Sequence, residues 1–197
     1  MKYPLTQIMC DVRALLGHNP DNQPLIEVDD LRTLTFDEII RQQMIPSVRM
    51  VLSKAPTERI DTCRPLRGAV GWKEQQGVGM AYMLLPDDFF RLLSVKMTDW
   101  HRPAQIITED HPLYALQSSP FHGVRGNPDR PVAAVVRYPE GLVLELYSSS
   151  GGAGVTIQRA LYVPQPHLTH DGYIDLPASL YDDILRQICE NVMMNSK

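Results

Sequence analysis

Hydrophobic positions with helical spacing open the chain. Between residues 5 and 16, apolar side chains recur every three or four positions and would form one stripe on a helix: Leu5, Ile8, Val12, Leu15 and Leu16. Gly17 follows directly, and glycine suits the left-handed conformation that ends many helices. The pattern predicts an amphipathic helix over residues 5–16. The Pro- and Asn-rich residues 19–24 then predict a loop, and residues 25–28 a short strand.

A second helix is predicted to begin at Thr35. Thr35 and Glu38 have the spacing of a capping box, in which each side chain satisfies a free amide at the start of a helix. The apolar positions of this segment recur every fourth residue: Phe36, Ile40, Met44, Val48 and Leu52. Pro46 lies within the run and removes one backbone hydrogen bond, at a cost of about 3 kcal/mol in an ideal helix. We therefore expect a kink or a break near residues 43–46.

The hydrophobic period changes to two from residue 77 onward, which is typical of strands. Strands are predicted over residues 78–84, 91–97, 102–107, 132–138, 142–147 and 155–163. Pro139-Glu140-Gly141 reads as a turn, so the two strands on either side of it should form an antiparallel hairpin. A short helix is predicted over residues 111–117 with Thr108 near its cap, and a Pro- and Gly-rich mobile loop over residues 119–131.

The last predicted element is an amphipathic helix after Pro177. Apolar pairs recur there every four residues: Leu180/Tyr181, Ile184/Leu185, Ile188/Cys189 and Val192/Met193. The whole pattern indicates an α+β fold with N-terminal helices, a central mainly antiparallel β-sheet and a C-terminal amphipathic helix. We expect residues 1–197 to form a single domain, with a helical base (1–55 and 176–197) and a β-rich middle (77–163).

Composition narrows the class of protein. The chain has 197 residues, of which 44% are hydrophobic and 21% charged, as in an ordinary globular protein. No apolar run reaches the roughly 20 residues of a membrane helix, and Asp11 and Arg13 interrupt the N-terminal segment, so a cytoplasmic location without membrane contact is expected. The three cysteines, Cys10, Cys63 and Cys189, are far apart, which favours reduced thiols over disulfides or a zinc site.

The formal net charge of −4 gives the chain no global attraction for nucleic acid. A local basic strip does exist, opposed by Glu58 and Asp61; its members are Lys54, Arg59, Arg64, Arg67 and Lys73. A solvated connector is the favoured interpretation of this strip, and a phosphate-binding surface is the alternative.

The adjacent carboxylates Asp87 and Asp88 are the first candidates for chemistry. Acid/base pairs usually converge from separate elements, so that their pKa values can be pushed apart. Because these two follow Pro86 directly, the favoured interpretation is a single helical turn with the acids near its positive end.

Other motifs are weaker. His167 and His170 have a metal-like spacing but lie in a Pro- and Gly-bounded loop, and the glycine-rich residues 148–154 lead into a strand, which favours a hairpin tip over a phosphate cradle. A cluster of His and Asp between residues 99 and 122 leaves one alternative open, a small-ligand-binding or metal-dependent hydrolytic domain with a cleft near His101, Asp110, His111 and His122. The sequence assigns no catalytic, cofactor-binding or metal-binding residue, and no cofactor.

Several segments, taken in order, resemble the head-to-tail adaptor (tail-tubular, or ring) proteins of short-tailed bacteriophages and prophages. The most specific segment is LPDDFFRLLSVKMTDWHRP at residues 85–103. The others are TFDEIIRQQMIPSVRMVLSKAP (35–56), PVAAVVRYPEGLVLELYS (131–148), LYVPQP (161–166) and DLPASLYDDILRQIC (175–189). The similarity spans residues 25–193, and Pro46 departs from it by interrupting the second helix.

The resemblance implies a structural protein and not an enzyme. Such a subunit self-associates into a ring, docks on the portal protein and contacts tail proteins. DNA would pass through the lumen without specific binding, and the protein would occur in the host cytoplasm and in the virion. Because the contacts of such a protein are surfaces, the resemblance transfers no functional residue.

Overall fold

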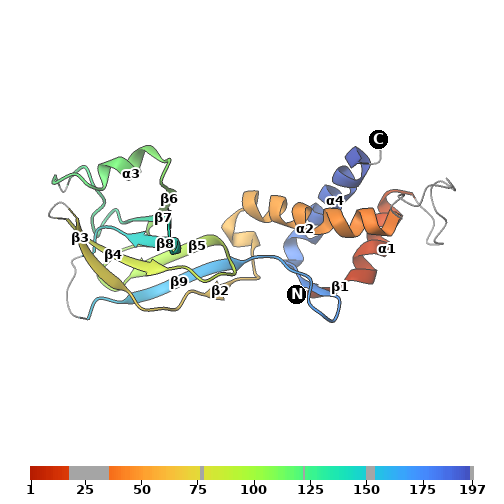
Figure 1. Cartoon of the computed structure of the whole chain (residues 1–197), viewed down its shortest axis with the longest axis horizontal. Helices are drawn as coiled ribbons and strands as arrows, with labels where there is room; N and C mark the ends of the chain where they lie inside the picture. The colour runs from red at the N-terminus through yellow and green to blue at the C-terminus, as the bar shows by residue number, and fades with distance from the viewer. Residues whose placement is uncertain (18–35, 76–77, 122, 150–153, 196–197) are drawn as a thin grey trace. The chain divides into compact units, whose positions relative to one another are not determined.

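A computed structural model describes residues 1–17, 36–75, 78–121, 123–149 and 154–195 (Figure 1). The chain divides into two compact units. The helical unit comprises residues 1–62 and 165–197, and the β unit comprises residues 63–164. The architecture is mixed α+β, with N-terminal helices, largely antiparallel sheets in the middle and a C-terminal helix, so the predicted fold class is confirmed. No helix of the described part of the chain is long and apolar enough to cross a membrane.

Three helices form the core of the helical unit: α1 (Leu5–Leu15), α2 (Phe36–Lys54) and α4 (Tyr181–Asn195). Strand β1 (Lys2–Pro4) pairs with β10 (Tyr173–Asp175) in an antiparallel ribbon, and single 3-10 turns occupy Thr57–Arg59 and Ala178–Leu180. The predicted first helix is confirmed, with Leu5, Ile8 and Val12 buried, although Leu15 is 58% exposed. Gly17 follows with φ +71°, the left-handed conformation expected at the helix end.

Helix α2 runs through Pro46 as one helix, so of the expected kink or break the break is absent. Ser47, the next residue, is fully buried; its hydroxyl donates to the Gln43 carbonyl (2.6 Å) and accepts from the Asn191 amide of α4 (2.8 Å). Tertiary packing of α2 against α4 thus offsets the hydrogen bond that proline removes. Thr35 of the capping box, the loop at 19–24 and the strand at 25–28 lie outside the described residues.

Two sheets make up the β unit. A five-stranded sheet has the order β3-β4-β8-β7-β6, and a three-stranded sheet has the order β2-β9-β5 (Figure 1). Their bounds are Arg64–Pro65 (β2), Gly71–Gln75 (β3), Val78–Leu84 (β4), Phe89–Met97 (β5), Gln105–Thr108 (β6), Val132–Tyr138 (β7), Gly141–Leu146 (β8) and Ile157–Pro164 (β9). All six predicted strands are present within a few residues, and the hairpin β7–β8 has the expected antiparallel register. The β6–β7 pair is parallel.

The main core of the β unit is formed by the two sheets, with Met83 and Leu144 from the larger sheet, Leu92 and Val95 from the smaller one, and Trp100 beyond β5. A second apolar cluster lies on the other face of the five-stranded sheet, under helix α3 (Pro112–Leu116). The predicted short helix is therefore confirmed; its N-cap is His111, whose N–H donates to the carbonyl of Thr108 (3.1 Å). His111 Nδ1 accepts a hydrogen bond from the Leu113 N–H (3.1 Å), and this bond satisfies a free backbone amide at the start of α3.

A strained serine follows strand β8. Ser148 has φ +78°, and its buried hydroxyl has no hydrogen-bond partner among the described residues. Because glycine adopts this conformation without the steric penalty, Ser148→Gly should raise the free energy of unfolding by about 1 kcal/mol in denaturant titrations. Ser149→Gly is the matched control and should lower it, since Ser149 Oγ donates to Asp99 (2.8 Å). A lower stability for Ser148→Gly would contradict this account of the turn.

Candidate functional site

The acidic pair Asp87-Asp88 lies in a turn between β4 and β5. The Phe89 N–H donates to the Pro86 carbonyl (2.9 Å), so these residues form a hydrogen-bonded turn and not the expected turn of helix. Asp87 is exposed, whereas Asp88 Oδ1 accepts from the Tyr162 hydroxyl (2.9 Å) and Oδ2 pairs with Arg64 (2.7 Å). Burial, together with the hydrogen bond to Asp88, raises the pKa of Tyr162. Asp88 thus links the turn to the β2–β9 pair.

The two aspartates should respond differently to the same substitution. Asp88→Asn weakens a partly exposed ion pair and a hydrogen bond, so we expect a loss of about 1 kcal/mol in the free energy of unfolding. Asp87→Asn, the matched control, should change it by less than about 0.5 kcal/mol. Urea unfolding of both variants makes the comparison. Equal losses would mean that Asp88 does not anchor the turn.

The structure gives the histidines of the 99–122 cluster different roles. His101 Nδ1 lies 2.6 Å from Asp129 Oδ1 on a largely exposed surface, while His111 caps α3. Asp110 is exposed, and His122 lies outside the described residues. In the loop that was the other candidate, His167 Nδ1 lies 3.1 Å from the Gln165 carbonyl, and His170 is exposed. Within the described ranges, no group of three or more His, Cys, Asp or Glu side chains could hold a metal ion.

Some cations of the basic strip lie beside acids. Arg59 pairs with Asp183 (2.9 Å) and Arg64 with Asp88 (2.7 Å), so two of its five cations have structural partners. Lys54 ends α2 and Lys73 lies on β3. Arg67, which comes directly after the β2–β9 pairing, has no described ion pair.

A buried carboxylate that the sequence analysis did not single out lies on the central strand β8. Glu145 is only 1% exposed, and its two oxygens accept hydrogen bonds from Tyr138 (2.7 Å) and Tyr147 (2.6 Å). Tyr114 of α3 packs edge-on against Tyr147, with ring centroids 6.4 Å apart. No salt bridge of the described residues involves Glu145. Its hydroxyl partners therefore replace a cation, and the arrangement fastens α3 to the sheet. The available signal was a single acid within the apolar run LVLEL.

The tyrosines of this cluster predict a loss of stability in alkali. The hydrogen bond to Glu145, reinforced by burial, raises the pKa of Tyr138 to about 12, and burial with the Glu145 bond raises that of Tyr147. The pKa of an unfolded tyrosine is near 10, and that of Tyr138 in the folded state is about 12. The stability that this difference contributes is fully present below pH 10 and is lost as the pH rises toward 12. We expect the free energy of unfolding to fall between pH 10 and pH 12, and to fall less in Tyr138→Phe. Denaturant titrations across this range measure it, and a flat profile would contradict it.

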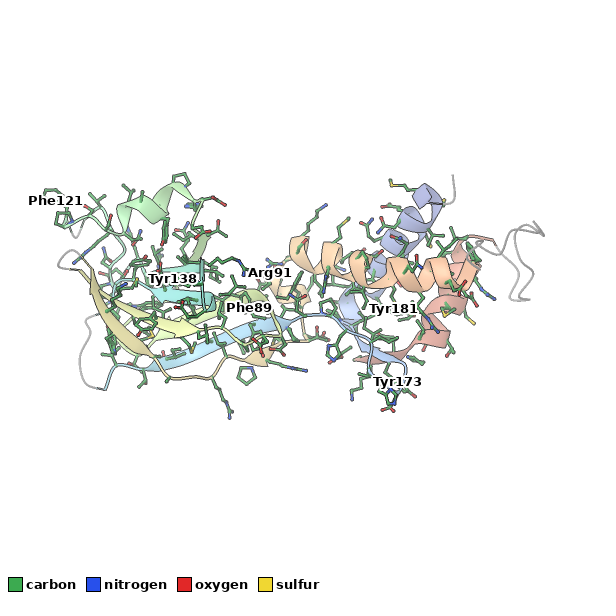
Figure 2. All side chains as sticks on the ribbon, in the orientation of Figure 1. Phe89, Arg91, Phe121, Tyr138, Tyr173 and Tyr181 are labelled. Carbon is green, nitrogen blue, oxygen red and sulfur yellow. The ribbon has the colours of Figure 1, made fainter. Side chains whose placement is uncertain are left out.

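An open groove of about 400 Å³ lies on the outer face of the five-stranded sheet, the face that also carries the apolar cluster under α3. It is lined by Lys73, Met80, Tyr82, Leu84, Tyr138, Glu140 and Val143 (Figure 2 shows Tyr138). Tyr82 and Leu84 are among the exposed large apolar side chains of the β unit, and Phe121 projects from the 119–131 loop with 72% of its surface exposed (Figure 2). Exposed apolar surface of this kind is typical of contact with another molecule.

Comparison with known proteins gives no family assignment: no family description matches the chain, and no curated protein matches it. The polar clusters of the described residues connect strands, turns and helices to one another, and the exposed apolar surface described in the β unit includes a groove on a sheet and an apolar loop.

Proposed function

We propose that this chain is a head–tail connector subunit of a phage or prophage, which assembles into a ring and docks on the portal protein. The observation that carries the proposal is the resemblance of residues 85–103 to the adaptor proteins of short-tailed phages. In the structure every residue of this segment is described, and most of its large apolar side chains pack in the main core of the β unit. It comprises the turn after β4, all of β5 and the region that leads to the buried Trp100.

The residues that carry the similarity are those that determine the fold of the segment. Phe89, Leu92, Val95, Met97 and Trp100 are all buried in the core of the β unit. A match at buried positions supports a shared fold more than a shared reaction, because core positions specify packing and not chemistry. This fits a connector, whose activity is assembly.

The surfaces of the β unit support the same proposal. Ring subunits associate head to tail, so each needs two different surfaces for its two neighbours. The concave groove around Tyr82 and Leu84 and the apolar loop that bears Phe121 are two such surfaces on one chain. On this proposal the partners are portal protein, tail proteins and further copies of the chain. The protein would occur in the host cytoplasm before assembly and in the virion afterward, with DNA passing through the ring.

Reconstitution tests the proposal. The purified chain is mixed with the portal protein encoded beside it, and the mixture is separated by gel filtration and imaged by negative stain, with each protein alone as the control. We expect co-elution and an added ring on the portal. Absence of both, with a folded chain and intact portal rings, would contradict the proposal.

A further inference from the structure

Two cations lie directly opposite each other on neighbouring strands of the three-stranded sheet. Lys96 of β5 is paired in register with Arg159 of β9. The adjacent pair, Val95 and Ala160, is buried in the core, and side chains alternate between the two faces of a sheet. Lys96 and Arg159 therefore share the outer face, where like charges in opposite positions repel.

A third cation extends this row. The register Arg64 with Tyr162 and Pro65 with Leu161 continues one step, because the Leu66 N–H donates to the Ala160 carbonyl (2.9 Å). The next residue, Arg67, is exposed while Leu66 is buried, and continuing the same register places it opposite Arg159. Because β9 lies between β2 and β5 (Figure 1), the three side chains form one row across the sheet, called here the cation row: Arg67, Arg159 and Lys96.

Nothing described in the chain neutralises the cation row. None of its members takes part in a salt bridge of the described residues, whereas Arg13, Arg59 and Arg64 each pair with an aspartate. Three adjacent cations on one face of a sheet repel one another and cost stability. An anionic partner that lies across the row would reverse the sign of this contribution.

We infer that the cation row binds the phosphate backbone of double-stranded DNA. Neighbouring strands lie about 4.8 Å apart, so the row spans about 10 Å. That length of duplex axis carries about three phosphates of one strand, at 3.4 Å each. On one side of the row, the next residues of this face are Pro65, Leu161 and Ser94, none of which has an aromatic ring on which a single-stranded base could stack. The face therefore fits a duplex backbone, which it contacts without reading sequence.

The inference does not depend on ring assembly. The chain as a whole carries a net charge of −4, so its attraction for DNA is confined to this face and is weak. If the chain is a connector, weak contact would let a duplex slide past. The test uses the free chain, so failure of this inference and failure of the connector proposal are separate results.

Fluorescence anisotropy with a labelled 20-base-pair duplex tests the inference on the whole chain. Neutralising about three phosphates gives a slope near −2.7 in log affinity against log salt, a loss of roughly 40-fold between 50 and 200 mM salt. The triple variant Arg67→Gln, Lys96→Gln, Arg159→Gln should lose at least about tenfold in affinity at 50 mM salt and flatten the slope. The single variant Arg159→Gln, at the centre of the row, should reduce the slope by about one.

A matched control removes the same charge elsewhere. Arg41, Arg49 and Arg137 are exposed and have no described ion pair, so their triple change to Gln should leave affinity within about twofold. Equal losses in the two triple variants would overturn the inference in favour of a general charge effect. Failure of the unchanged chain to bind at 50 mM salt would also overturn it. So would an effect of the row variant on self-association alone, measured by sedimentation, which would assign the face to a second copy.

Discussion

Replacing Trp100 by alanine is expected to lower the free energy of unfolding by about 4 kcal/mol. Trp100 is only 2% exposed and packs in the main core of the β unit with Val95 and Met97. Truncating a buried tryptophan removes its transfer free energy and leaves a cavity, at 3–5 kcal/mol in typical cores. A domain of this size has roughly 5–15 kcal/mol of stability in total, so the variant would be close to unfolding.

The chain supplies a matched control for this prediction. Trp72 on the edge strand β3 is 40% exposed, and Trp72→Ala should cost about 1 kcal/mol or less. Urea unfolding followed by circular dichroism measures both variants. If Trp100→Ala does not fold, Trp100→Phe, which keeps most of the packed volume, should fold with a loss of about 1 kcal/mol. Similar losses at Trp100 and Trp72 would contradict the packing described for residues 85–103.

The second large effect is expected at the carboxylate of Glu145. Tyr147→Phe removes one of its two hydroxyl donors and should lower the free energy of unfolding by about 2 kcal/mol, because a buried charged acceptor loses a hydrogen bond. Glu145→Leu removes the acceptor and leaves two hydroxyls unpaired. The double variant should be more stable than the sum of the two losses predicts, by about 1 kcal/mol or more, since no polar group is then orphaned on that side.

Tyr173→Phe is the control for the hydroxyl. Tyr173 lies on β10 in the helical unit (Figure 2), is exposed, and its hydroxyl makes no hydrogen bond within the described part of the chain. Tyr173→Phe should therefore change the free energy of unfolding by less than about 0.5 kcal/mol. Chemical denaturation of the four variants gives the coupling energy. Strict additivity of Tyr147→Phe and Glu145→Leu would mean that the two side chains do not interact.

Hydrophobic periodicity predicted most of the fold because the long elements bury one face. Helix α4 and strand β4 have clear periods, and their predicted bounds agree with the structure to within a few residues. Strand β3 was missed because Trp72 is its one large apolar residue among Gly71–Gln75, and its conformation comes from pairing with β4. Such a strand depends on its neighbour and not on its own pattern.

Two further differences have the same origin in tertiary contacts. Pro46 signals a break locally, but Ser47 and Asn191 join α2 to α4, which no local pattern indicates. Glu145 resembles an ordinary outward-facing residue of an alternating strand, and only the fold brings Tyr138 and Tyr147 to its two oxygens. The role of Asp88 was predicted in outline as structural, while its partners Arg64 and Tyr162 are distant in sequence.

The most direct test of the connector proposal is the protein content of assembled particles. Particles are induced from cells that encode the chain, purified on a density gradient, and analysed by quantitative mass spectrometry. The proposal predicts that the chain is present in multiple copies per particle, in a fixed ratio to the portal protein. Particles that contain portal protein and tail proteins but none of this chain would contradict it.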